Sequence, residues 1–219
     1  WKHHRQETSV LRFVTRLIQW TVIYRTGIRS FFSLHIYRHE NKPSKYLTTR
    51  KYAKVMHSLT PFYYQCLLED KLVFDRYMKS FGFPLPELLG TIENGTIQWF
   101  EPFRKEKLEQ ITAYDLDCFV KILTKWGGEN VHRLEISSSG IRINRVAAGI
   151  NELRALTSNG IYVLQRTVIQ HDAMRQINAS SVNTVRMVTI HDGNQARNLL
   201  SFVRMGVKNS LVDNITQGR

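Results

Sequence analysis

Positively charged side chains lie within β-branched segments near the C-terminal end of the chain. Arg186 lies in the middle of the segment 182–190, and Arg204 lies in a second apolar segment shortly after it. A strand that only fills a core does not need a cation at its centre, because a buried charge is costly unless it is paired. Two arginines carried on neighbouring strands therefore predict a site for an anion, most simply the phosphate of a nucleotide.

A lysine and a pair of glycines suggest a second contact with phosphate. Lys121 lies in the apolar segment 117–123, and Gly127 and Gly128 follow it. An ammonium group on a strand can reach phosphate oxygens, and glycines let backbone N–H groups approach phosphates without a Cβ in the way. The pattern is not a Walker A loop, which requires GxxxxGK[ST]. An edge-strand lysine before an ordinary glycine turn remains the alternative interpretation.

A third segment, residues 162–171, is typical of a strand that leaves into a polar turn. Such an exit can present backbone N–H and C=O groups to the edge of an adenine, although a core strand with a solvated end fits equally well. His171 follows the strand and is more typical of a helix cap or a surface position than of catalysis. It has no neighbours that would form a Ser/His/Asp or Cys/His set.

These segments require a frame of mixed helices and strands. Apolar periodicity and turn residues predict helices over 8–39, 51–59, 65–81, 105–113 and 151–157, and the helix within 65–81 is expected to begin near Glu69-Asp70-Lys71. The same criteria predict strands over 88–92, 96–99, 117–123, 133–136, 141–145, 162–168, 185–190 and 199–205. Asn94-Gly95 is a favoured tight turn between two of these strands. The order indicates the α+β class, with a helical N-terminal part and small mixed lobes after it.

The charge of the chain is concentrated in its N-terminal part. The net charge is +13, and residues 1–61 hold twelve Lys and Arg against two acids. The remaining residues hold nineteen Lys and Arg against sixteen acids, so they are nearly balanced. We therefore predict a basic helical N-terminal segment over residues 1–61 and a second region over 62–219. No RNP-type aromatic motif, zinc finger or RGG tract accompanies the charge, so we do not expect nucleic acid as a partner.

Residues 8–39 place apolar side chains at helical spacing with arginines between them. The arginines interrupt every long apolar run, which excludes a membrane-spanning helix in this segment. A basic amphipathic helix can lie on an anionic membrane surface, but it can equally dock on its own domain with a solvated basic face. The second interpretation is the simpler one. Cys66 and Cys118 have no CxxC partner, so a zinc site is not expected.

Taken together, these segments resemble the ATP-grasp superfamily, and more closely its sugar-transfer associated family, which is found with polysaccharide-biosynthesis enzymes. The resemblance covers roughly residues 45–219. It is carried by five blocks in order: Glu69-Asp70-Lys71, Phe119-Val120-Lys121 with Gly127-Gly128, Gln165-Arg166 with Gln170-His171, Asn183-Thr184-Val185-Arg186, and Val212-Asp213-Asn214 with Gln217-Gly218. The last two blocks are the most specific to this family.

The resemblance implies two α+β lobes that grip ATP between them, preceded by the N-terminal helical segment. It implies that Lys71 faces the nucleotide and that Lys121 binds phosphate, with Gly127 and Gly128 in the loop that closes on it. The adenine hinge would be formed by Gln165, Arg166, Thr167 and Val168, with His171 close by. The transferred phosphate or an acyl phosphate would face Arg186 and Arg204, and further phosphate contacts would come from Asn183 and Asn214.

The resemblance also implies an ATP-dependent carboxylate–amine ligase that uses Mg²⁺ and acts on a cell-surface sugar or its precursor. The acidic Mg²⁺ ligands of such enzymes are expected beyond Arg219. The partners would be ATP and a sugar-type or amino-acid-type substrate, in the cytoplasm, with peripheral contact at the inner membrane face through residues 1–61 as an open option. The chain departs from the family's usual pattern at Ile122, where proline is common, and at Gln165, where glutamate is common. A non-catalytic nucleotide-binding scaffold at the membrane face therefore remains the alternative function.

Overall fold

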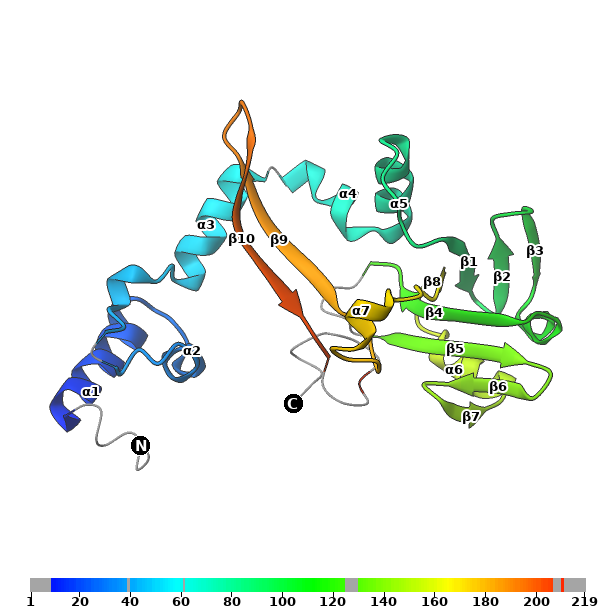
Figure 1. Cartoon of the computed structure of the whole chain (residues 1–219), viewed down its shortest axis with the longest axis horizontal. Coiled ribbons are helices and arrows are strands. Elements are labelled where there is room, and N and C mark those ends of the chain that lie inside the picture. Colours follow the sequence, from blue (N-terminus) through cyan, green and yellow to red (C-terminus); the bar gives the residue numbers. More distant parts are fainter. Residues whose placement is uncertain (1–8, 39, 61, 125–129, 207–209, 211–219) are drawn as a thin grey trace. The chain divides into compact units, whose positions relative to one another are not determined.

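The computed structural model describes residues 9–38, 40–60, 62–124, 130–206 and 210. The chain divides into two compact units, Trp1–Gln65 and Cys66–Arg219, and each is described below by itself (Figure 1). Among the described residues, no helix is both long enough and apolar enough to cross a membrane.

The N-terminal unit is helical, but its first helix is shorter than predicted. It contains α1 (Val10–Ile18), a π-helical turn (Gln19–Ile23), α2 (Ile28–Ser33) and α3 (Thr49–Leu59), with single 3-10 turns at Pro43–Lys45 and Phe62–Tyr64. A continuous helix over 8–39 is therefore wrong. The chain turns after the π-helical turn, where Arg25 takes a left-handed φ of 48° and Gly27 precedes the first turn of α2. The left-handed φ of Arg25 interrupts the helical run, and Gly27 is the N-cap at which α2 begins.

An aromatic cluster forms the core of the N-terminal unit. Trp20, Phe31, Ile36 and Tyr37 are fully buried, and Phe13 and Leu17 of α1 pack against them. Helix α1 thus docks on its own unit through one face, as the simpler interpretation of the sequence expected. Arg16, beside this face, donates through its guanidinium to the carbonyl oxygen of Ile36 at 2.9 Å.

The C-terminal unit opens with two helices where the sequence predicted one. Helix α4 (Cys66–Glu69) ends before Asp70, and α5 (Lys71–Ser80) begins after it. The Asp70 carboxylate accepts hydrogen bonds from the backbone N–H groups of Leu72 and Val73 at 2.8 and 3.0 Å. Asp70 is therefore the N-cap of α5, a position that a residue in the middle of one long helix cannot occupy.

Eight antiparallel strands build the main sheet, in the spatial order β3-β2-β1-β8-β4-β5-β6-β7 (Figure 1). The strands are β1 (Leu88–Glu93), β2 (Thr96–Trp99), β3 (Arg104–Lys107), β4 (Leu116–Ile122), β5 (Val131–Ser137), β6 (Gly140–Ile143), β7 (Val146–Ala148) and β8 (Tyr162–Arg166). The first two strands are joined by the predicted turn, in which Asn94 and Gly95 have φ of 49° and 71°. Strand β8 comes last in sequence and lies between β1 and β4.

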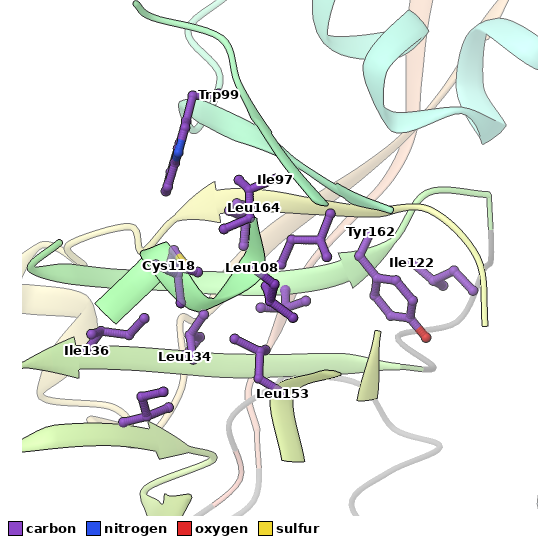
Figure 2. Close-up of a cluster of buried hydrophobic side chains, with 14 residues drawn as sticks. Ile97, Trp99, Leu108, Cys118, Ile122, Leu134, Ile136, Leu153, Tyr162 and Leu164 are labelled. Carbon is purple, nitrogen blue, oxygen red and sulfur yellow. The ribbon is translucent and has the colours of Figure 1, made fainter. Parts of the chain in front are cut away.

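One face of this sheet packs on the main hydrophobic core. Cys118, Val120 and Ile122 of β4 lie in this core with Tyr162 and Leu164 of β8 (Figure 2). The 3-10 segment Leu108–Ala113 and helix α6 (Ile150–Leu156) add the buried residues Leu108, Ile111 and Leu153.

The predicted helix over 105–113 is wrong in its first part, because Arg104–Lys107 is strand β3 at the edge of the sheet. Charged residues favour a helix locally, but pairing of β3 with β2 prevails here. The side chain of Glu106 shows one reason, since it accepts hydrogen bonds from Trp99 Nε1 and, at 3.0 Å, from the Tyr114 hydroxyl.

The predicted C-terminal hairpin is confirmed. Strands β9 (Thr184–His191) and β10 (Ala196–Arg204) pair with each other as a separate two-stranded antiparallel sheet. A short helix, α7 (Asp172–Arg175), lies between β8 and β9 in the sequence. The α+β fold class expected from the sequence is thus confirmed.

Candidate active site

The alternation of side chains along β4 separates the core from the candidate site. Cys118, Val120 and Ile122 face the core, so Asp117, Phe119 and Lys121 face the opposite side of the sheet. Pairing with β8 places Gln165 beside Phe119 and Val163 beside Lys121 on that same side. We call this the polar face of the sheet. Its middle is formed by β4 and β8, which are central strands held by neighbours on both sides.

Three of the predicted nucleotide contacts meet at a cavity of about 210 Å³ on the polar face. Lys71, Lys121 and Gln165 all line it, together with Phe74, Asp75, Leu85, Pro86, Leu88 and Val163. Lys121 Nζ donates to Gln165 Oε1 at 2.5 Å and lies 5.4 Å from the centre of the Phe119 ring. Lys71 and Lys121 therefore lie at one cavity, and their contact with a nucleotide remains a prediction.

Lys71 holds the end of strand β4. Its Nζ donates to the carbonyl oxygens of Ile122 and Leu123 at 2.7 and 2.9 Å. The lysine is the first residue of α5, so the Asp70 cap fixes the point from which it reaches the strand. Leu72, the next residue, packs against a small apolar cluster that includes Val163. Lys71 thus positions the segment that leads from β4 toward Gly127 and Gly128.

The cavity is electropositive. Burial, and after it the neighbouring charge of Lys71, lower the pKa of Lys121 from 10.5 to about 8. Burial also lowers the pKa of Lys71, with Asp70 acting against it. The cavity includes one carboxylate, Asp75, whose Oδ2 pairs with Lys79 at 2.9 Å. Within the described part of the chain, Lys121 has no carboxylate partner.

A second cavity, of about 350 Å³, lies farther along the same face. Its walls include Asp117 and Phe119 of β4, Arg133 of β5 and the residues Thr167 to Gln170 that follow β8. Because Phe119 and Lys121 are two positions apart on one strand, the two cavities follow each other along β4. Together they offer a positive end at Lys121 and a mixed polar and apolar end at Thr167 and Val168.

Asp117 organises the second cavity. Its carboxylate accepts two hydrogen bonds from Arg133, at 2.9 and 2.8 Å, and one from the Thr167 hydroxyl at 2.8 Å. The hydrogen bonds from Arg133 are the main reason that the pKa of Asp117 is lowered, and the bond from Thr167 adds to the effect. The sequence analysis did not select Asp117 or Arg133. The two-residue spacing from Lys121 is the signal that could have identified Asp117.

Within the predicted adenine hinge, the structure separates residues whose backbone N–H groups are already bonded from those that follow them. The backbone N–H of Arg166 donates to Glu87 O at 2.9 Å, and that of Thr167 donates to Asp117 O at 3.1 Å. These two amides are therefore engaged within the fold. Arg166 pairs with Cys118 across the ladder, so its side chain leaves on the other side from Gln165, and it forms an ion pair with Glu87 at 2.5 Å. Only Val168 and the residues after it lie beyond these backbone contacts.

Two other predicted contacts serve the local structure. His171 is the N-cap of α7, and its Nδ1 accepts a hydrogen bond from the backbone N–H of Ala173 at 3.2 Å. Asn183 is buried, and its side-chain amide donates to Met174 O at 2.7 Å and to Asn178 O at 3.0 Å. Asn183 thus fastens the start of β9 to the loop around α7. A nucleotide contact for either residue remains a prediction.

The two arginines with which the sequence analysis began share one face of the β9–β10 hairpin. Arg186 lies opposite Phe202, and Arg204 lies opposite Thr184, two positions away on the neighbouring strand. Such diagonal neighbours have Cα atoms about 7–8 Å apart. Arg186 is exposed and Arg204 is partly buried. They therefore lie close enough to contact one anion together, and both this contact and a common site with Lys121 remain predictions.

The remaining predicted contacts, Gly127, Gly128 and Asn214, lie outside the described residues. In the described part of the chain, no three His, Cys, Asp or Glu side chains gather in a way that would hold a metal ion.

The N-terminal helices and the large antiparallel sheet, with Lys121 of β4 and Lys71 of α5 at one cavity, are consistent with the ATP-grasp fold. The model of the family described as sugar-transfer associated ATP-grasp matches residues 52–219, and the chain belongs to this family. Membership implies an ATP-dependent activity of the ligase type that is associated with sugar transfer. No curated protein and no solved structure matches the chain.

Proposed function

We propose that this chain joins a carboxylate to an amine at the expense of ATP, through an acyl phosphate, and that its substrate is a cell-surface polysaccharide or a sugar precursor. Family membership supports the use of ATP and the association with sugar transfer. The observation that carries the proposal is Lys121, a largely buried cation beside Lys71.

Lys121 is suited to bind phosphate because its charge is not balanced by the fold. Its ammonium contacts a neutral amide and an aromatic ring, and the nearest other charge that affects it is the cation of Lys71. A cation in a low-dielectric site attracts an anion more strongly than one in water does. The negative charge of an incoming phosphate would therefore offset both effects that lower the pKa of Lys121, namely burial and the repulsion by Lys71.

In this proposal the nucleotide lies along β4. Its phosphates contact Lys121, and its base lies in the second cavity beside Val168. Val168 follows Arg166 and Thr167, whose backbone amides are engaged within the fold. Asp117 and Arg133 would line the part of the second cavity between the base and the phosphates. The side chain of Arg166 is not included, because it leaves on the other side of the sheet.

The proposed reaction has two steps. A carboxylate oxygen of the substrate attacks the γ-phosphorus of ATP, and ADP leaves. The nitrogen of an amine then attacks the acyl carbon, inorganic phosphate leaves, and the amine loses a proton. Both steps place negative charge on phosphate oxygens, which fixed cations stabilise. Arg186 and Arg204 are assigned to this charge because they share one face of their hairpin.

The family generally uses Mg²⁺ with ATP, and the metal would supply positive charge that offsets the charge of the phosphates when bound. We also propose that the reaction takes place in the cytoplasm, where ATP is supplied.

Calorimetric titration of the full-length protein with Mg-ATP tests the role of Lys121. Replacing Lys121 with Met keeps the length of the side chain and removes the charge. We expect affinity to fall about 10- to 100-fold, since a hydrogen bond to a charged group contributes about 1.5–3 kcal/mol. The matched control is Lys105→Met, because Lys105 is an exposed lysine on the edge strand β3.

Unchanged affinity in Lys121→Met would refute the proposed role of this lysine. Release of ADP in the presence of carboxylates and amines then tests the chemistry. Tight binding of ATP without any turnover would instead favour a nucleotide-binding scaffold.

A further inference from the structure

Helix α3 is amphipathic, and its apolar face is exposed. Tyr52, Val55, Met56 and Leu59 follow the i, i+3, i+4, i+7 spacing that places side chains on one side of a helix. Between 40% and 54% of each of these residues is accessible to solvent. Every residue from Arg50 to Thr60 is exposed. This differs from α1, which buries one face in the core of the same unit.

The opposite side of α3 is basic. Arg50, Lys54 and His57 follow the same helical spacing, Lys51 lies beside them, and the helix contains no acidic residue. The described residues of the N-terminal unit contain ten Lys and Arg and one acid, Glu40. The helix therefore belongs to a unit with a strong excess of positive charge.

Aromatic residues extend the apolar surface beyond the end of α3. Phe62, Tyr63 and Tyr64 form a 3-10 turn and are 77%, 72% and 55% exposed. The rings of Tyr63 and Tyr64 contact each other, with their centroids 4.7 Å apart. Aromatic side chains with a polar tip are favoured where an apolar layer meets water.

We propose that the apolar face of α3, with the aromatic turn after it, docks on the surface of an anionic lipid bilayer. A single helix of about 12 residues is marginally stable in water, so α3 is expected to gain stability from an apolar surface against which it packs. A helix with aromatic and aliphatic residues on one side and Lys and Arg on the other lies in the plane of a membrane interface. The charge of the unit selects anionic headgroups as the complementary surface. The proposal thus narrows the membrane contact considered for residues 1–61 to α3 and the aromatic turn after it.

Flotation with lipid vesicles tests the proposal on the full chain. We expect the protein to float with vesicles of phosphatidylcholine and phosphatidylglycerol in equal parts, and to remain unbound with phosphatidylcholine alone. Added salt should release it, because the attraction to anionic headgroups is screened.

Two independent variants of α3 separate the apolar and the ionic contributions. Val55→Gln combined with Met56→Gln should weaken binding at least about tenfold, because two apolar side chains no longer enter the interface. Arg50→Gln, Lys51→Gln and Lys54→Gln together should weaken it roughly a hundredfold, since each cation near an anionic surface contributes about fivefold. All five positions are exposed, so neither variant removes a buried contact.

The matched control removes three charges from the C-terminal unit, at the exposed positions Lys105, Lys107 and Arg142. Replacing these three with Gln should leave vesicle binding unchanged. Failure of the wild-type chain to float with anionic vesicles would overturn the proposal. Binding of both α3 variants as strong as that of the wild type would overturn it too. A fall in the solution mass of the apolar variant, measured by light scattering, would overturn it in favour of a contact between two copies.

Discussion

The buried charge of Lys121 should make the free protein less stable than it would be with an apolar side chain at that position. The pKa of Lys121 is lowered from 10.5 to about 8, which means that the unfolded chain holds this proton more tightly than the folded chain does. Each unit of difference in pKa corresponds to about 1.4 kcal/mol, so keeping the ammonium protonated at pH 7 costs about 3 kcal/mol. The cost declines as the pH rises from 8 toward 10.5, where the folded protein loses the proton first, and is about 1 kcal/mol at pH 10.

Lys121→Met should therefore stabilise the free protein at neutral pH. Loss of the hydrogen bond to Gln165 offsets about 1 kcal/mol, so the expected net gain in the free energy of unfolding is about 2 kcal/mol. For a domain of this size that gain raises the melting temperature by roughly 4–8 °C. At pH 10 the gain should almost disappear.

Urea denaturation followed by circular dichroism at pH 7 and pH 10 measures this difference. Lys105→Met removes the same charge from an exposed position and should stay within about 0.5 kcal/mol of the wild type at both pH values. A Lys121→Met protein that is equally destabilised at both pH values would refute the reasoning, because the ammonium would then be favourable in the fold.

Nucleotide should close most of this gap in stability. A ligand present at about 100 times its dissociation constant stabilises the protein that binds it by about 2.7 kcal/mol. The wild type should gain this amount from Mg-ATP, whereas Lys121→Met, with affinity about 10- to 100-fold lower, should gain only about 0.4–1.4 kcal/mol. If both proteins gain equally, the phosphates do not contact Lys121.

Three further substitutions test how the frame of the site is held. Gly90→Ala should cost about 1–3 kcal/mol of unfolding free energy in urea denaturation, because a Cβ there would lie 2.4 Å from the backbone oxygen of Gln98. An unchanged free energy of unfolding would mean that β1 and β2 separate easily. Asp117→Asn should cost up to about 1 kcal/mol at pH 7, since its bonds to Arg133 are partly exposed and screened. That cost should decline as the pH falls through the lowered pKa of the wild-type carboxyl, where the wild type becomes protonated too, and a loss that persists there would contradict the assigned ionic role. Asp70→Ala should cost about 1 kcal/mol by uncapping α5, and circular dichroism that shows no loss of helix or stability would argue against the cap.

The local parts of the site could be predicted from the sequence, because they depend on alternation and turn chemistry. Strand β4 was located by its apolar pattern, and the Asn94-Gly95 turn was located by its residue types. Side-chain alternation along β4 also fixes which residues accompany Lys121 on the polar face. The hairpin that carries Arg186 and Arg204 was found in the same way.

The pairing of distant segments could not be predicted from these signals. The position of β8 between β1 and β4 depends on contacts far apart in sequence, and it is this pairing that brings Gln165 to Lys121 and turns Arg166 away. Strand β3 was missed because its charged residues favour a helix locally, while its stability comes from β2. The helix start near Glu69-Asp70-Lys71 was found from the sequence, but the separate helix α4 before it was missed.

The central position of β8 also bears on how the protein is made. Strands β1 to β3 and β4 to β7 each pair with sequence neighbours, so two partial sheets can form while the chain is still emerging from the ribosome. Strand β8 must then enter between them, and contacts of such long sequence separation slow folding. Until it does, two strand edges stay open to wrong partners. Because Gln165 reaches Lys121 across 44 positions, competence for nucleotide would arise only when this last strand has closed the sheet. Chaperone dependence during synthesis should therefore be highest between the appearance of β4 and the insertion of β8.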